Sequence, residues 1–163
     1  MNRYIVVVFI EKITIYAGEI MKKLKWYGIL FALFILFLYI MGTYDIFMML
    51  SHNETYYASK EYGESVINYF TNYLLYMMVF WIGNLIGGSI SPVLYFAKNK
   101  HAYKIAFISA ASDFILIVLG TAFRNRLNVF GINIFCFDLF ILIATFLFGI
   151  YLYQANRSEI LYH

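Results

Sequence analysis

The sequence holds 163 residues, of which 63% are hydrophobic and only 13% are charged. A soluble domain is about half apolar and about a quarter charged, and one buried core cannot hide this much apolar surface, so lipid must cover part of it. The composition therefore excludes a soluble globular domain. The formal charge of +3 is small and divided among several segments, so it does not indicate a nucleic-acid partner.

The first 20 residues differ in character from the rest of the chain. Their apolar stretch, residues 4–10, is too short to cross a bilayer, whereas "MKKLKWYGILF" from Met21 is typical of the start of a membrane span. The peptide Ala-Gly-Glu-Ile before Met21 can be encoded by a purine-rich ribosome-binding sequence. We expect residues 1–20 to be a mis-called N-terminal extension and residues 21–163 to form one domain; the alternative is an interfacial helix at 1–20.

Four apolar blocks in the remaining chain are each long enough to cross a bilayer, which takes about 20 helical residues. Charged or turn-forming residues bound each block. The blocks are 26–50, 69–97, 103–123 and 128–153. They predict an all-α fold, a four-helix transmembrane bundle.

Lysine and arginine side chains favour cytoplasmic segments, which sets the orientation of such a bundle. With a cytoplasmic N-terminus, the inner segments hold Arg3, Lys12, Lys22, Lys23, Lys25, Lys98, Lys100, Lys104 and Arg157, and the outer ones hold Lys60, Arg124 and Arg126. This excess predicts that both termini are cytoplasmic. The tyrosine-rich stretch 56–76 then lies at the outer interface, where tyrosine rings commonly anchor.

The loop between the first two spans carries a helical pattern. In "YYASKEYGESVINYF" the residues Tyr57, Glu61, Glu64 and Asn68 recur at helical spacing. The pattern predicts a short interfacial helix between the first and second spans.

Each span also carries a stripe of small or polar residues at helical spacing. The stripes are Gly28, Ala32, Tyr39, Gly42 and Asp45; Asn84, Gly87, Gly88 and Ser91; Ala106, Ser109, Asp113 and Gly120; and Gly131, Asp138, Thr145 and Gly149. Small residues let membrane helices approach closely and polar ones bond across the contact, so the stripes predict a compact bundle. Pro92 is expected to kink the second helix or to end its regular part. Cys136 is the only cysteine, which excludes an internal disulfide, and its apolar surroundings favour a buried small residue over a reactive thiol.

The polar residues at membrane depth are the candidate site. Asn84, Asp113 and Asp138 lie near the middle of their spans, and Asp45 lies toward the outer end of the first. An ionised Asp at a helix centre costs about 2.5–3.5 kcal/mol, so these side chains should face the bundle interior or a wet cavity.

Each of these carboxyl groups can be in one of two protonation states. Either burial keeps an Asp protonated, as a hydrogen-bonding pin between helices, or water and polar neighbours hold it ionised. Arg124 and Arg126 lie at the outer rim, from which their side chains could reach down toward Asp138 or Asp45. Alternatively, the same residues form a functional site for a cation, a proton or a polyhydroxyl solute.

Other chemistry is not indicated. The sequence has no glycine-rich phosphate loop, no histidine pair at metal-ligand spacing and no nucleophile beside a base. We therefore expect no enzyme activity, no metal and no cofactor.

The stretches "GTYDIFMMLSHNETYYASKEYGES" and "VFWIGNLIGGSISPVLYFAKNKHAYKIAFISAASD" resemble a family of small four-span bacterial membrane proteins of unestablished function. The matching positions are Gly42, Asp45, Asn53, Tyr56, Trp81, Gly88, Ser89, Lys98 and Lys100. The resemblance covers roughly residues 26–120 and implies a location in the bacterial inner membrane. Some relatives carry the label "sugar transporter".

Two functions follow from these observations. The first is a small-solute carrier for a sugar or polyol, with Asp113, Asp138 and Asn84 lining the site and Asp45 at its mouth, because polyhydroxyl solutes suit carboxylate and amide acceptors beside aromatic faces. Four helices make a thin wall, so such a carrier is expected to be a homodimer. The alternative is an accessory or structural membrane protein whose polar stripe packs helices or binds a partner. A central cavity that contains Asp113 favours the first function, and a dry stripe favours the second.

Overall fold

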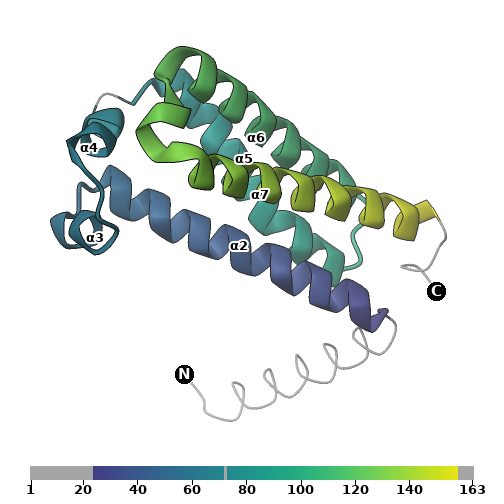
Figure 1. The fold of residues 1–163 in the computed structure, drawn as a ribbon. Helices are drawn as coiled ribbons and strands as arrows, with labels where there is room; N and C mark the ends of the chain where they lie inside the picture. Colours follow the sequence, from purple (N-terminus) through teal and green to yellow (C-terminus); the bar gives the residue numbers. More distant parts are fainter. Residues whose placement is uncertain (1–23, 72, 158–163) are drawn as a thin grey trace, which may run out of the picture.

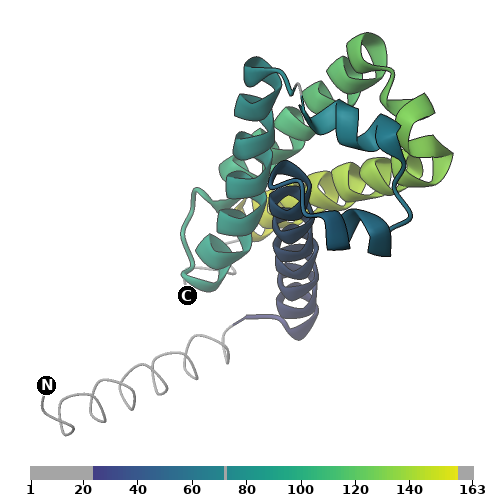
Figure 2. The same ribbon diagram turned by 90° about the vertical axis from the view of Figure 1, so that its left-hand side faces the viewer.

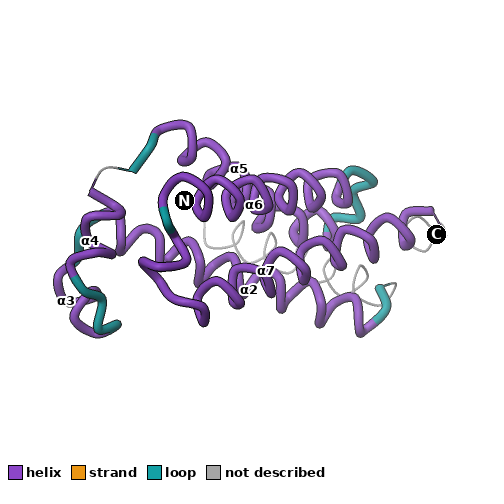
Figure 3. The backbone as a smooth tube through the Cα atoms, turned by 45° about the horizontal axis from the view of Figure 1, so that its top comes forward, coloured by secondary structure: helices purple, strands orange, loops and turns teal. Residues whose placement is uncertain are grey.

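A computed structural model describes residues 24–71 and 73–157 of the chain. Its helices are α2 (Trp26–Leu50), α3 (Glu54–Ser59), α4 (Glu64–Thr71), α5 (Leu75–Phe96), α6 (Ala102–Arg124) and α7 (Arg126–Arg157). Four of these, α2, α5, α6 and α7, are long and apolar enough to cross a membrane. The prediction of an all-α bundle with four spans is confirmed, and short loops join the helices (Figure 3). The expected N-terminal extension, residues 1–20, lies outside the described residues.

The two ends of the bundle differ. The start of α2, the turn between α5 and α6, and the end of α7 lie together at one end, here called the terminal end (Figure 1). The short helices α3 and α4 lie across the opposite end, the cap end, beside the turn from α6 to α7. Both ends of the spanning region therefore lie on the same side of the bundle.

The predicted interfacial helix between the first two spans is present, but as two helices. The side chain of Asn53 caps α3 by accepting a hydrogen bond from the Tyr56 amide at 2.8 Å. Glu61 adopts a left-handed conformation, with φ 55°, and this ends the first helix before Gly63 starts the second. The second span begins at Leu75 and not near residue 69, because Leu74 is extended and separates α4 from α5.

Several rings of the tyrosine-rich stretch pack inward and not outward as an anchoring belt would, although Tyr76 is 49% exposed. Tyr57, Val66, Tyr69 and Phe70 form a buried cluster at the cap end, here called the cap cluster. Tyr56 is buried as well. Burial of this cluster holds α3 and α4 onto the spans.

The spans α5, α6 and α7 pack closely through small residues. A Cβ atom added to Gly87 would lie 2.9 Å from the Cβ of Ser109, and one added to Gly149 would lie 3.0 Å from the Phe107 ring. Glycine at these positions lets the helix backbones approach, as the stripes predict. The helix α5 continues through Pro92 to Phe96, so the proline does not end it.

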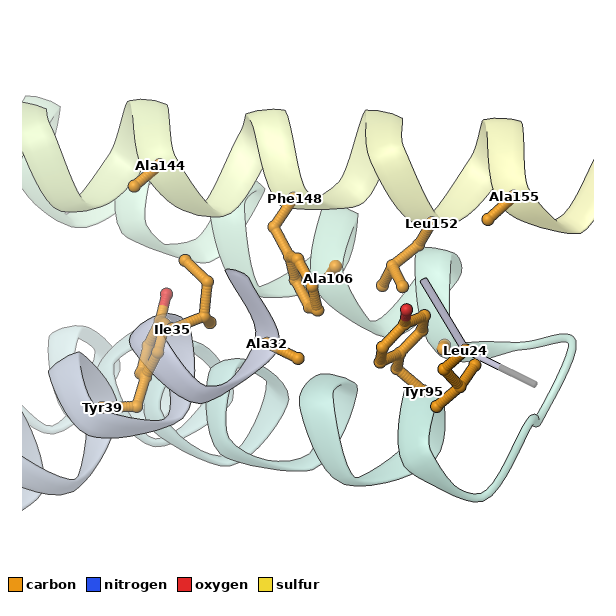
Figure 4. Packing of buried hydrophobic residues seen from close by; sticks show 11 residues of the cluster. Leu24, Ala32, Ile35, Tyr39, Tyr95, Ala106, Ala144, Phe148, Leu152 and Ala155 are labelled. Atoms are coloured by element: carbon orange, nitrogen blue, oxygen red, sulfur yellow. The ribbon is translucent and has the colours of Figure 1, made fainter. Parts of the chain in front are cut away.

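The terminal half of the bundle holds an apolar core. It includes Ile35 of α2, Tyr95 of α5, Ala106 of α6 and Phe148 and Leu152 of α7, all nearly or fully buried (Figure 4). These side chains fill the space between the four spans at this end. The bundle is therefore closed on its terminal side.

The fourth span departs from the prediction in two ways. Gly131 has φ 79° and interrupts α7, so it bends the chain and is exposed instead of packing against a neighbouring helix. Cys136 is also exposed on the bundle surface, so the expectation of a buried cysteine was wrong. Asn125, in the left-handed conformation, joins α6 to α7 directly.

Candidate functional site

A cavity of about 450 Å³ lies in the cap-end half of the bundle. Its walls come from all four spans and from the segments around α3 and α4. The four predicted site residues, Asp45, Asn84, Asp113 and Asp138, all line this cavity, one from each span. The helical stripes place them there because each polar side chain turns away from lipid.

Asp113 of α6 and Asn84 of α5 are joined directly. The Asn84 amide Nδ2 donates to Asp113 Oδ1 at 3.0 Å, and both side chains are buried. The second carboxyl oxygen, Oδ2, is also buried and has no hydrogen-bond partner among the described residues. A proton can therefore sit on Oδ2 without the loss of a hydrogen bond.

Tyr39 of α2 forms the floor of the cavity and contacts the other three spans. Its hydroxyl group donates to Asn84 Oδ1 at 2.8 Å and lies 3.0 Å from Ser109 Oγ and 2.9 Å from Thr145 Oγ1. The Ser109 hydroxyl in turn donates to the Asn84 carbonyl at 2.7 Å. The sequence placed Tyr39 on the packing stripe and did not identify it as part of the site.

The Tyr39 ring lies on the surface of α5 at a glycine. A Cβ atom on Gly88 would overlap the Tyr39 ring. The absence of a side chain there gives the ring its position, and the ring in turn separates the cavity from the apolar core. The cavity therefore ends at Tyr39 on its terminal side.

Asp138 of α7 is paired with Arg126, as the sequence allowed. Arg126 Nη2 lies 2.8 Å from Asp138 Oδ2, and Nε donates to the same oxygen at 2.9 Å. The bend at Gly131 turns the first residues of α7 back, which brings Arg126 to a carboxylate 12 positions along the chain. Arg124 forms no ion pair with an acidic residue in the described part of the chain; it donates to the Tyr69 carbonyl, and its guanidinium carbon lies 4.8 Å from the Tyr69 ring centroid.

Asp45 of α2 is fixed by a hydrogen bond from the short helix α3 at the cap end. The Tyr56 hydroxyl group donates to Asp45 Oδ1 at 2.6 Å. Burial, followed by this hydrogen bond, raises the pKa of the Tyr56 phenol above its usual value of 10.0. Tyr56 therefore remains a neutral donor to Asp45 throughout the physiological pH range.

Aromatic side chains form the cap-end wall of the cavity. The ring centroids of Tyr73 and Trp81 lie 4.9 Å apart, and the Phe70 ring stacks on Trp81 with a centroid distance of 5.8 Å. Burial also raises the pKa of Tyr73, which keeps its hydroxyl group protonated. Trp81 appeared in the sequence only through the family resemblance, and Tyr73 was not singled out as a site residue.

The charges on the cavity wall are mixed. Among the described lining residues are the carboxyl groups of Asp45, Asp113 and Asp138 and the cations Lys60 and Arg126. With Asp138 neutralised by Arg126, the acceptors that remain for a ligand come from Asp45 and Asp113. Such a set can bind hydroxyl groups or a cation.

The four long apolar helices are those of a multi-pass membrane protein, with a cavity between them that both polar and apolar side chains line. No protein-family model matches the chain, and neither a curated protein nor a solved structure matches it.

Proposed function

We propose that this protein is a carrier that binds a small polyhydroxyl solute, a sugar or a polyol, in the cavity at the cap end. The observation that carries the proposal is the position of Asp113 on the cavity wall with Oδ2 buried and unpaired. A buried acceptor without a partner costs about 1–3 kcal/mol. A ligand hydroxyl group that reached Oδ2 once the Asp113 side chain turned toward the cavity would recover that free energy, so the site favours a hydroxyl donor.

The size and lining of the cavity support the same ligand class. Small-molecule pockets are typically about 300–1,000 Å³, and this cavity measures about 450 Å³. Asp45 and Asp113 offer acceptors, the Asn84 side chain lies between Asp113 and Tyr39, and Trp81 and Tyr73 offer ring faces. Acceptors beside aromatic faces suit the alternating polar edges and apolar faces of a sugar ring.

An accessory or structural role explains part of the polar stripe. The contacts of Tyr39 with Asn84, Ser109 and Thr145 pack four helices and need no ligand. A packing role gives no reason for the cavity beside them or for the unpaired Asp113 Oδ2. We therefore prefer the carrier, acting as a homodimer because four helices form a thin wall.

We further propose that both termini are cytoplasmic, so that the cap end faces the exterior of a bacterial inner membrane. Cysteines placed at Lys60 and at Lys100, in a Cys136→Ala background, can be labelled on intact cells with an impermeant maleimide. We expect labelling at position 60 and none at position 100. The reverse pattern would place the cap end in the cytoplasm and overturn this orientation.

Uptake into proteoliposomes tests the carrier itself. Labelled sugars and polyols are screened with and without a pH gradient, against protein-free liposomes. We expect saturable uptake of at least one solute, and at least tenfold slower uptake for Asn84→Ala, which removes the amide between Tyr39 and Asp113. Cys136→Ser, a substitution at an exposed position outside the cavity lining, should transport normally. Saturable uptake that Asn84→Ala leaves unchanged would overturn the assignment of the site.

A further inference from the structure

The cavity has an open side between α2 and α7. Phe37 and Met41 of α2 and Phe137 of α7 all line it, yet they are 59%, 45% and 50% exposed. A side chain that lines a cavity and is also half exposed on the outer surface lies at an opening. We call this opening the lateral opening and define it by Phe37, Met41, Ile134 and Phe137.

The cavity is closed toward the terminal end and partly covered toward the cap end, where the exposed side chain of Lys60 also lines it. Toward the terminal end, two aromatic pairs join α2 to α7. The ring centroids of Phe34 and Phe140 lie 6.2 Å apart, and those of Phe31 and Phe148 lie 5.1 Å apart. Toward the cap end, cap-cluster residues such as Tyr69 form part of the cavity wall. Figure 2 shows the cap end, with the end of α2 and the start of α7 apart from each other and with α3 and α4 lying in front of the spans.

The lateral opening is apolar, whereas the rest of the cavity wall carries polar groups among apolar side chains. All four residues at the opening are hydrophobic, and they belong to α2 and α7, which are long and apolar enough to cross a membrane. The acceptors Asp45, Asn84 and Asp113 line the same cavity, and Asn84 and Asp113 are buried. A hydrated free sugar gains nothing from an apolar passage, but an alkyl chain passing through it stays in contact with apolar side chains and lipid.

We propose that the ligand is amphipathic: a sugar or polyol head group bound by Asp45, Asn84 and Asp113, with an apolar chain that leaves through the lateral opening into the bilayer. This inference rests on the proposed function and names its substrate class, a glycolipid presented from the membrane. The chain adds apolar contact at Phe37, Met41 and Phe137, which a free sugar cannot make.

Trp81 provides a reporter for the test. It lies on the cavity wall, and the second tryptophan, Trp26, is 71% exposed at the terminal end. A Trp26→Phe variant in nanodiscs therefore reports on the cavity through Trp81 alone. It is titrated with octyl glucoside below its micellar concentration, with free glucose and with octanol.

We expect a saturable change in Trp81 fluorescence for octyl glucoside, at a concentration at least about tenfold lower than for glucose, and no saturable change for octanol. Equal concentrations for glucose and octyl glucoside would overturn the lipid-side proposal and leave the sugar carrier intact. Equal concentrations for octanol and octyl glucoside, or no saturable change for any of the three, would overturn both.

Photolabelling locates the chain independently. An alkyl glucoside with a diazirine near the end of its chain is irradiated with the nanodisc protein, and the labelled peptides are identified by mass spectrometry. We expect labels at Phe37, Met41 and Phe137, competed by excess octyl glucoside. Ile90 of α5 and Ile108 of α6 are exposed on other faces and serve as controls for labelling from bulk lipid. Labelling as strong at these controls as at the lateral opening would contradict the proposal.

Discussion

The hydroxyl group of Tyr39 lies 2.8 Å from Oδ1 of Asn84, and this contact orients the amide. With Oδ1 turned toward Tyr39, the Nδ2 group points the other way and donates to Asp113. The amide thus connects the floor of the cavity to the carboxyl group on its wall. A change at Tyr39 should therefore affect both the packing of the bundle and the position of Asp113.

Tyr39→Phe tests the packing part of this relationship. The substitution keeps the ring against Gly88 but leaves Asn84 Oδ1 with only its contact to Ser109. Because hydrogen bonds between membrane helices contribute modestly, we expect the free energy of unfolding to fall by about 1 kcal/mol. Reversible unfolding in mixed micelles measures it, with Tyr153→Phe on the exposed face of α7 as the control. An equal loss in the two variants would contradict a special role for the Tyr39 hydroxyl group.

Gly88→Ala tests whether the Tyr39 ring packs directly against the backbone of α5 at Gly88. The new Cβ would overlap the Tyr39 ring, so the ring must move and its hydroxyl group must leave Asn84. We expect a loss of about 1–3 kcal/mol in unfolding free energy.

Gly42→Ala is the matched control for Gly88→Ala, because its Cβ would lie 3.9 Å from the nearest atom, Leu85 Cδ2. We expect that change to stay within about 0.5 kcal/mol. If Gly88→Ala lowered the unfolding free energy as little as Gly42→Ala, the Tyr39 ring would not pack against Gly88.

The sequence predicted the polar residues of the site for a general physical reason. A carboxyl or amide group at mid-span is costly against lipid, so Asn84, Asp113 and Asp138 had to face inward wherever the helices met. The same reasoning could not predict which residues form hydrogen bonds with these polar side chains. Tyr56 reaches Asp45 only because α3 folds back over α2, and a tyrosine near a span end is equally typical of an interfacial anchor.

Two errors in the fourth span have separate causes. A glycine in an apolar helix is consistent with close packing and with a positive φ, and the sequence alone did not distinguish these at Gly131. The stripe of Asp138, Thr145 and Gly149 marks the inward face of this span, and Cys136 lies two positions from Asp138, about 200° around the helix. The expectation of a buried cysteine considered only the apolar neighbours of Cys136 and not this position. Cys136 was therefore assigned to the wrong face.

The pair of Arg126 and Asp138 should be energetically coupled. Arg126→Gln leaves the Asp138 carboxylate without its charged partner, and Asp138→Asn does the same to the guanidinium group. We expect each single change to lower the unfolding free energy by about 1–3 kcal/mol, and the double variant to lose less than the sum. A double-mutant cycle in mixed micelles measures the coupling. Strict additivity would show that the contact contributes nothing.

Asp113→Asn separates the two functions proposed for the central carboxyl group. An amide still accepts from Asn84 Nδ2 through its own oxygen, so we expect the unfolding free energy to change by less than about 0.5 kcal/mol. If the carboxyl group binds or couples to the transported solute, uptake should fall at least tenfold although the protein folds normally, because the substitution removes the titratable acceptor at Oδ2. Asp113→Leu is the contrasting variant: it leaves Asn84 Nδ2 unpaired and should cost about 1–3 kcal/mol in stability as well. Thermal stability and uptake are measured on the same preparations of wild type, Asp113→Asn and Asp113→Leu. Unchanged uptake in Asp113→Asn would remove this carboxyl group from any proton- or cation-coupled mechanism and would reduce it to a hydrogen-bonding pin between α5 and α6.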